Sequence, residues 1–242
     1  MKVQLENLCK QFGANIVLDH VNLSEVEGSL ISVIGPSGAG KSTLLRILSG
    51  LDNQVSGRAI INDKEILFDD KHALRQYRRE NAVVFQQHNL LPHLNVLNNI
   101  TFPLRHIARM NAKKAEAMAM ELLERFKLTE HSRKYPHQLS GGQSQRIAIA
   151  RGLVVQPHIL FLDEPTAALD PEMTYEVLQM VAEIQQTGTH ILLVTHNIRF
   201  ALQCGANFLF VDDGAVNYYA AEDIKQPASG SRMAHFLQYA ML

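Results

Sequence analysis

Apolar and polar residues alternate in short segments along the first part of the chain, up to residue 61. Alternation predicts half-buried strands, because successive side chains of a strand point to opposite faces of a sheet. The segments cover residues 3–5, 16–18, 21–23 and 58–61. We therefore expect an antiparallel β-layer. Residues 29–34 form a nearly continuous apolar run instead, which predicts a fully buried strand.

Helical patterning dominates from about residue 89 to residue 155. Residues 112–126 consist mostly of strong helix formers. Residues 145–156 predict another helix, and we place Gly141 and Gly142 just ahead of its first turn. This stretch is therefore expected to form an α-helical subdomain.

Strands and helices alternate again in the last third of the chain. Apolar runs at 159–162 and 191–194 predict parallel strands covered on both faces. Asp170-Pro-Glu between them starts a helix that ends at Gly188. Two further segments predict a hairpin, and a last group of apolar residues predicts a short amphipathic helix. The hairpin segments are residues 207–211 and 215–219. The apolar residues of the helix are Met233, Phe236, Leu237 and Met241.

These elements predict one α/β domain over residues 1–242. Residues 1–88 and 156–242 are expected to form its core, with a mostly parallel sheet and the antiparallel β-layer. Residues 89–155 are expected to form the inserted helical subdomain. A chain of 242 residues is long enough to bury a sizeable core.

A glycine-rich segment, Gly35-Pro-Ser-Gly-Ala-Gly-Lys-Ser42, separates the buried strand at 29–34 from a predicted helix. It matches the phosphate-binding P-loop, in which backbone N–H groups face nucleotide phosphates. Lys41 is expected to reach the β- and γ-phosphates, and the Ser42 hydroxyl to bind Mg²⁺. The predicted ATP-binding residues here are Gly35, Pro36, Ser37, Gly38, Ala39, Gly40, Lys41, Ser42 and Thr43.

Leu139-Ser-Gly-Gly-Gln143 resembles the signature of ATP-binding-cassette (ABC) ATPases, which other P-loop classes lack. Further matches to that family run along the chain in the family's order. Phe12 matches the aromatic that stacks on adenine, Gln86 the Q-loop glutamine, residues 159–164 the Walker B strand, Ala168-Leu-Asp170 the D-loop and His196 the switch histidine. The chain thus resembles an ABC nucleotide-binding subunit, which implies a P-loop NTPase core.

The resemblance implies catalytic roles for Gln86, Glu164 and His196, and it implies a metal site. Asp163 would bind Mg²⁺ together with Ser42 and Gln86, and Glu164 would act as the general base. Gln86 would also contact the attacking water, and His196 would donate to the γ-phosphate. The alternatives are that Asp163 and Glu164 are a surface pair closing a strand and that Phe12 belongs to the core.

The resemblance also implies a second subunit. ABC cassettes bind ATP between the P-loop of one cassette and the signature of another, and this chain has one copy of each motif. A second copy of the chain is the expected partner. The residues expected to contact the partner's ATP are Ser140, Gly141, Gly142, Gln143 and Asp170.

Composition excludes several other classes. The formal net charge is −1 and no run of basic residues occurs, so nucleic acid is not an expected partner. Cys9 and Cys204 lack metal-ligand spacing and are interpreted as buried thiols in a reducing compartment. No signal peptide is visible, and no apolar run approaches the ~20 residues that span a bilayer.

Residues 88–96 and 166–172 resemble cassettes of bacterial polar-amino-acid importers. That resemblance implies separate transmembrane permease subunits, a solute-binding protein acting through them, and a peripheral position on the cytoplasmic face of the inner membrane. Leu90, Leu91 and Leu94 are expected to line a docking groove for a permease helix, or else to pack within the helical subdomain. The chain departs from the pattern at Ser144, Asn197 and residues 217–220, and the transported solute is not identified by the sequence. The alternative is a cell-division or lipoprotein-extraction ATPase.

Overall fold

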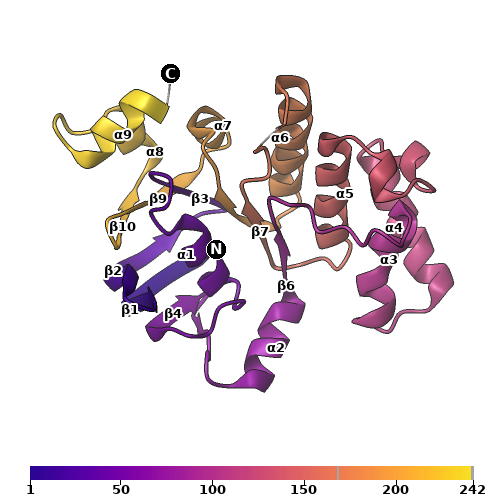
Figure 1. Ribbon diagram of the computed structural model, residues 1–242, viewed down its shortest axis with the longest axis horizontal. Coiled ribbons are helices and arrows are strands. Elements are labelled where there is room, and N and C mark those ends of the chain that lie inside the picture. The colour runs from indigo at the N-terminus through magenta and orange to yellow at the C-terminus, as the bar shows by residue number, and fades with distance from the viewer. Residues whose placement is uncertain (168, 241–242) are drawn as a thin grey trace. The chain divides into compact units, whose positions relative to one another are not determined.

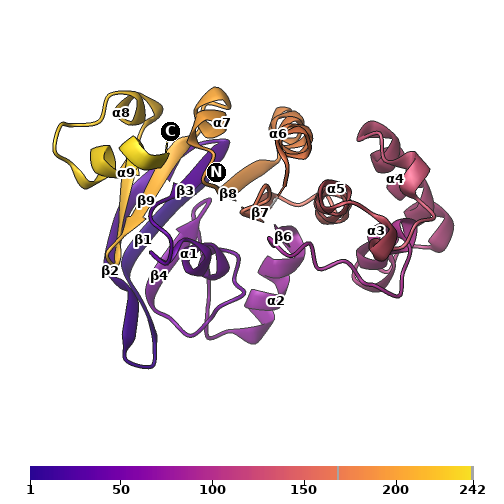
Figure 2. The same ribbon diagram turned by 45° about the horizontal axis from the view of Figure 1, so that its top comes forward.

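The computed structural model describes residues 1–167 and 169–240, which form two compact units (Figures 1 and 2). The first unit comprises Met1–Glu80 and His190–Leu242, and the second comprises Asn81–Thr189. The predicted helical subdomain, residues 89–155, lies within the second unit. That unit also contains two strands and a further helix. Ala168 of the expected D-loop and Met241 of the expected terminal helix lie outside the described residues.

The predicted antiparallel β-layer is present in the first unit (Figure 1). Its strands are β1 (Lys2–Phe12), β2 (Asn15–Glu27), β4 (Ser56–Ile61) and β5 (Lys64–Glu65), in the order β2-β1-β4-β5. The two segments predicted at 16–18 and 21–23 are one strand, β2. Along β1, Val3 and Leu5 are buried while Gln4 between them is partly exposed, which is the alternation predicted for residues 3–5. The pairing with β2 shifts between Leu5 and Leu8, and Leu8 is buried as well.

The other strands of the first unit are β3 (Leu30–Ile34), β8 (His190–Val194), β9 (Asn207–Asp212) and β10 (Ala215–Tyr219). β3 pairs in parallel with both β8 and β9, and β10 pairs antiparallel with β9, which confirms the predicted hairpin. All five residues of β3 are buried. Parallel strands covered on both faces require such continuous apolar runs.

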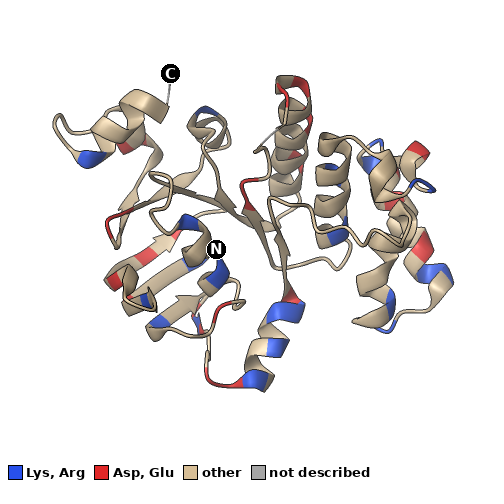
Figure 3. Ribbon diagram, viewed as in Figure 1, with Lys and Arg blue, Asp and Glu red and all other residues tan. Residues whose placement is uncertain are grey.

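Five helices accompany these strands in the described part of the first unit. They are α1 (Lys41–Leu48), α2 (Lys71–Glu80), α7 (Ile198–Gln203), α8 (Ala221–Lys225) and α9 (Arg232–Ala240). The sequence predicts α1 and α9 but not the other three. α2 carries the basic residues Lys71, Arg75, Arg78 and Arg79 and buries only Leu74 (Figure 3).

The second unit contains the parallel strands β6 (Asn81–Val84) and β7 (Ile159–Asp163). Its helices are α3 (Val96–His106), α4 (Ala112–Arg125), α5 (Gly141–Leu153) and α6 (Pro171–Gln186), with short 3-10 turns at Thr129–His131 and Pro136–Gln138. Gly141 and Gly142 are the first two residues of α5, so their predicted place ahead of the helix is wrong. The reason is that Ser140, rather than a later residue, caps the helix.

The cysteines also differ from the expectation. The side chains of Cys9 and Cys204 are both half-buried rather than fully buried. Among the described residues, no helix has the length and apolar character needed to cross a bilayer.

Candidate active site

The P-loop of the first unit connects the end of β3 to the start of α1. Gly35 and Gly40 have φ values of 146° and 102°, which L side chains rarely adopt. A Cβ on Gly35 would overlap the carbonyl oxygen of Val211 on β9, and a Cβ on Gly40 would lie 2.7 Å from Cγ1 of Val17 on β2. Glycine is therefore required at both positions because neighbouring strands approach the loop closely.

Lys41 is the first residue of α1, and its side chain turns back over the P-loop. Its Nζ donates to the carbonyl oxygens of Gly35 (2.9 Å) and Pro36 (2.8 Å), and the residue is only 5% exposed. The N-cap residue of α1 is Gly40, which has no side chain to cap the helix. The N–H groups of the first turn therefore face the loop, together with a buried ammonium, and this arrangement suits an anion with several oxygens.

Helix α2, which the sequence does not predict, holds the other end of α1. The Tyr77 hydroxyl donates to the carbonyl of Leu48 (2.6 Å), and Nε of Arg78 donates to the carbonyl of Gly50 (2.7 Å). Burial raises the pKa of Tyr77, so its hydroxyl stays protonated and remains a donor. These contacts fix the helix whose N-terminus carries the P-loop lysine.

His196 lies beyond the carboxyl end of β8 and is exposed to solvent. Because β8 and β3 are parallel neighbours, His196 and the P-loop both follow strands at the same edge of the sheet. Asn197, where the family pattern usually has an acid, is the N-cap of α7, and its side chain accepts from the backbone N–H of Phe200 (3.0 Å). Asparagine and aspartate serve equally well at an N-cap, so this departure leaves the backbone around His196 intact.

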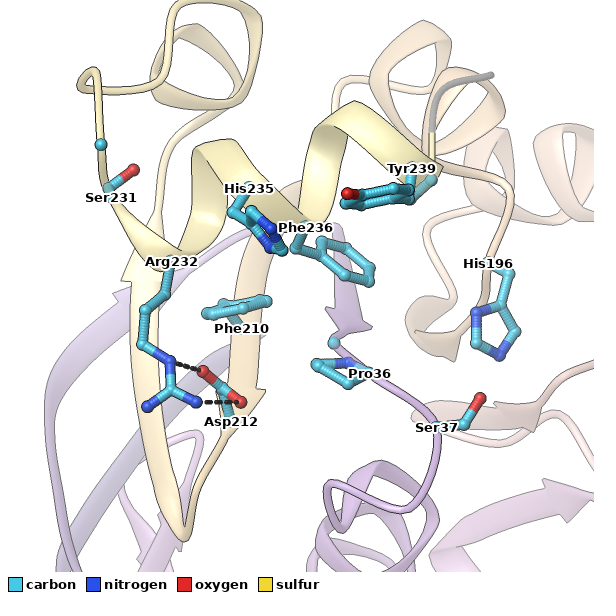
Figure 4. A pocket seen from close by; sticks show the side chains of 13 residues that line it. Pro36, Ser37, His196, Phe210, Asp212, Ser231, Arg232, His235, Phe236 and Tyr239 are labelled. Atoms are coloured by element: carbon cyan, nitrogen blue, oxygen red, sulfur yellow. Dashed lines mark hydrogen bonds and ion pairs between the residues drawn. The ribbon is translucent and has the colours of Figure 1, made fainter.

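A cavity of about 620 Å³ in the first unit lies between these two elements and the C-terminal helix (Figure 4). Pro36, Ser37 and His196 line one side, and α9 lines the other. Arg232 of α9 forms ion pairs with Asp212 and Asp213 (2.5 and 3.3 Å). Two aromatic rings, Phe210 of β9 and Phe236 of α9, pack with their centroids 5.4 Å apart. The sequence predicts α9 from its apolar spacing, but nothing in the pattern indicated that it borders the P-loop.

The two acidic residues of the expected Walker B segment follow β7 in the second unit. Asp163 ends the strand, and Glu164 has a left-handed φ of 46°, which is uncommon for a residue other than glycine. The chain turns at once, with the N–H of Ala167 donating to the carbonyl of Glu164 (3.1 Å). Gln86 follows β6, which pairs in parallel with β7, so Gln86 and the two acids share one edge.

Oxygen donors of this kind suit Mg²⁺, which prefers carboxylate and other hard oxygen ligands. Asp163 and Gln86 supply them in the second unit, and the hydroxyl of Ser42 supplies one in the first. The positions of Asp163 and Gln86 are described within the second unit, and that of Ser42 within the first.

The signature segment, residues 139–143, begins helix α5. Ser140 is its N-cap: its hydroxyl accepts from the N–H of Gln143 (3.2 Å), and the Gln143 side chain accepts from the N–H of Ser140 (3.0 Å). A hydroxyl that accepts one hydrogen bond still has its own proton to donate. Ser140 is exposed, so the start of α5 presents a hydroxyl donor and helix N–H groups to a ligand.

Gly142 is buried against helix α6. A Cβ at this position would lie 2.6 Å from Sδ and 2.7 Å from Cβ of Met173. Asp170 caps α6 by accepting from the N–H of Met173 (2.8 Å). Met173, in the first turn of α6, therefore contacts both the signature residue Gly142 and the expected D-loop residue Asp170.

Arg151 joins the far end of α5 to the segment that follows Gln86. Its guanidinium donates to the carbonyl oxygens of Asn89 (2.7 Å) and His88 (3.1 Å). Burial lowers the pKa of Arg151. Sequence reasoning missed this residue, because its partners lie more than sixty positions away.

Asn99 fixes the turn that carries the three leucines. It is fully buried; its side-chain NH₂ donates to the carbonyls of Leu91, Leu94 and Asn95, and its oxygen accepts from the N–H of Leu91 (2.7 Å). Leu90, Leu91 and Leu94 are themselves half-buried. Hydrogen bonds from the buried Asn99 side chain thus fix the backbone of the turn, while its leucines remain partly accessible.

Phe12, the expected adenine-stacking residue, is 53% exposed and does not belong to the core. Nζ of Lys10 lies 4.5 Å from the centroid of its ring. Its exposed ring leaves a face for stacking, and its contact with adenine stays a prediction.

Comparisons with known proteins agree with this geometry. A model of the ABC transporter family matches residues 18–167. The chain is 40% identical to the glutamine transport ATP-binding protein GlnQ of Escherichia coli, over 98% of this chain and 99% of that protein. It is 42% identical to the general L-amino acid transport ATP-binding protein AapP of Rhizobium johnstonii, over 88% and 83% of the two chains. A solved dimeric structure of the ATP-binding cassette MJ0796, in a post-hydrolysis state with ADP and Pi, shares 36% identity and a TM-score of 0.80, with 90% of this chain and 98% of that chain covered.

Proposed function

Because the chain belongs to the ABC transporter family, we propose that it is the ATP-hydrolysing subunit that powers import of an amino acid through a separate membrane permease. The observation that carries the ATPase assignment is the buried Lys41 ammonium beside the uncapped N-terminus of α1. The observation that carries the amino-acid assignment is the close similarity to relatives named for amino-acid transport.

Hydrolysis transfers the γ-phosphoryl group of ATP to water. Such reactions need positioning and charge neutralisation more than covalent chemistry, and the P-loop supplies both through Lys41 and its N–H groups. Glu164 accepts the proton of the attacking water, and His196 donates to a γ-phosphate oxygen. Ser42, Gln86 and Asp163 are the residues that would hold Mg²⁺, and the ion would neutralise charge on the phosphates.

A second copy of the chain completes the site. Ser140 and the N-terminus of α5 contact the γ-phosphate of the ATP bound to the partner, and Asp170 lies near the same phosphate. The similarity to a dimeric cassette supports this arrangement. Hydrolysis removes the γ-phosphate contacts and so releases the two copies.

A mixing experiment tests the arrangement in trans. Ser140→Arg places a bulky cation where the partner's phosphate should bind, and Lys41→Ala removes the cation of the P-loop. Each variant alone should be inactive. A heterodimer of the two has both lesions in one composite site and none in the other, so ATPase activity should partly return on mixing. A mixture that stays inactive in every ratio, although the proteins co-elute as a dimer with ATP, would show either that the site does not form in trans or that one intact site does not turn over without the other.

Helix α5 offers a physical link from that site to the permease. It begins at the capping box of Ser140 and reaches, through Arg151, the carbonyls of residues 88 and 89. The three leucines that follow, Leu90, Leu91 and Leu94, line the docking groove for a cytoplasmic helix of the permease. The chain then sits peripherally on the cytoplasmic face of the inner membrane.

The import assignment is tested on the intact complex. The chain, tagged and purified from solubilised membranes with its permease, is reconstituted into proteoliposomes, with any solute-binding protein that accompanies it. ATP hydrolysis is then measured against a panel of amino acids. We expect one or a few of them to stimulate hydrolysis, and Glu164→Gln to abolish the response. If no amino acid stimulates a complex that hydrolyses ATP, amino-acid import is refuted and a cell-division or lipoprotein-extraction machine is favoured.

A further inference from the structure

Three side chains of the β-layer bring a sulfur, a nitrogen and an oxygen donor together. Cys9 lies on β1, and Asp19 and His20 lie on β2; one ligand atom from each falls within 4.8 Å of the other two. The side chains of Asp19 and His20 are 59% and 76% exposed, and Cys9 is half-buried. Among the described residues, this is the one group of three or more potential metal ligands that meets this criterion.

A β-bulge creates the cluster. The pairing of β1 with β2 shifts between Leu8↔Val21 and Lys10↔Leu18, so Cys9 faces two residues, Asp19 and His20. Neighbours in a regular strand point to opposite faces, but His20 has a left-handed φ of 46°, which breaks the alternation. Both side chains can therefore approach the sulfur of Cys9.

Hydrogen bonds hold the three groups in this arrangement. The backbone N–H of His20 donates to Sγ of Cys9 (3.2 Å), and Nδ1 of His20 lies 2.8 Å from Oδ1 of Asp19. The backbone of Asp19 is itself fixed, since its N–H donates to the carbonyl of Gly214 (2.9 Å) in the β9–β10 turn. The donors are thus oriented by the fold before any ion arrives.

We propose that Cys9, Asp19 and His20 form a binding site for a zinc-class divalent cation. Thiolate, imidazole and carboxylate are the three ligand types that Zn²⁺ uses in proteins, whereas Mg²⁺ and Ca²⁺ avoid sulfur. Three protein ligands leave the fourth tetrahedral position to water. Binding releases the thiol proton of Cys9 to solvent, and the His20 nitrogen that binds the ion carries no proton, so the neutral imidazole keeps its proton on the other ring nitrogen.

Cobalt provides the direct test, because a thiolate bound to Co²⁺ gives a charge-transfer absorption in the near ultraviolet. Tag-free, reduced protein is titrated with Co²⁺, and Zn²⁺ is then added as competitor. We expect one equivalent of Co²⁺ to bind with the thiolate band, and Zn²⁺ to abolish the band. Cys9→Ser should lose it.

Two further variants identify the other ligands. His20→Asn keeps a residue that tolerates the left-handed backbone, and Asp19→Asn keeps the shape of the side chain. Each should weaken binding at least about tenfold, since loss of even an outer-shell partner has an effect of that order. Cys204→Ser and His72→Asn are the matched controls and should bind as the parent does.

Thermal melting of every variant in EDTA separates loss of a ligand from loss of the fold. If Cys9→Ser melts like the parent and binds Co²⁺ equally well, the site is refuted. It is also refuted if the folded parent shows no thiolate band at one equivalent, or if Cys204→Ser is the variant that loses the band. None of these results depends on ATP hydrolysis.

Discussion

Two consecutive glycines, Gly141 and Gly142, open helix α5, and the structure predicts different effects on stability when each is replaced with alanine. A Cβ on Gly141 would meet only Cδ2 of Leu169, at 3.4 Å, which is an ordinary contact. A Cβ on Gly142 would lie 2.6–2.8 Å from three atoms of Met173, including its Cβ. The Met173 Cβ cannot swing aside as the end of a flexible side chain can, so α5 and α6 must move apart.

The change in the free energy of unfolding of each variant is the sum of two contributions. Alanine is better than glycine within a helix by up to about 1 kcal/mol, and both substitutions share that gain. Overpacking of a well-packed contact costs about 1–3 kcal/mol, and only Gly142→Ala incurs it. The expected free energy of unfolding is therefore equal to or up to about 1 kcal/mol above the parent's for Gly141→Ala. For Gly142→Ala it is about 1–3 kcal/mol below that of Gly141→Ala.

Urea unfolding followed by circular dichroism measures the difference, and equal slopes would show that only stability has changed. Met173→Ala in the Gly142→Ala background removes the Sδ and Cγ contacts but keeps the 2.7 Å contact with Cβ, so it should restore only part of the loss. If the two single variants are equally stable, α6 moves away from α5 without loss of stability, and the packing argument is wrong. The ATPase rate, measured on the same samples, then reports separately on the contact predicted with the partner's phosphate.

Four further outcomes are expected. Lys41→Ala should bring the ATPase rate to background in a phosphate-release assay, because the cation held over the P-loop is gone; near-parental turnover would contradict the P-loop assignment. Glu164→Gln should slow hydrolysis by about 10²–10⁴-fold and trap an ATP-dependent dimer on size exclusion, unless another group is the base. Tyr77→Phe should lower the free energy of unfolding by about 1–3 kcal/mol, since the buried carbonyl of Leu48 loses its donor; an unchanged urea midpoint would show that water replaces it. Burial lowers the pKa of His131 below 6.5, so the unfolded chain takes up the proton first and stability should fall as pH drops below about 6.5; His131→Gln should flatten that dependence.

The parts of the site that depend on local sequence could be predicted. The P-loop follows from glycines that no other residue can replace and from the apolar run of β3, and both are visible in consecutive residues. The same holds for β7 and β8. The family match, residues 18–167, confirms the ABC resemblance on which the roles of Glu164 and His196 depend.

Features that depend on distant partners could not be predicted. Helix α2 buries only Leu74, so it leaves almost no apolar pattern, and its importance comes from Tyr77 reaching Leu48. The bulge opposite Cys9 arises from the register between two strands, which the alternation alone does not specify. Arg151 has no sequence signal at all, because its role depends on carbonyl groups, and every residue has one.

The cavity beside the P-loop also provides a natural position for an optical probe. The chain contains no tryptophan, so a single one introduced by substitution can be excited selectively. Phe236 packs on Phe210 in that cavity, whose other wall includes Ser37 and His196 (Figure 4). An indole at position 236 would change its emission whenever the polarity of the cavity changes, and binding at the P-loop could be followed in real time without a labelled nucleotide.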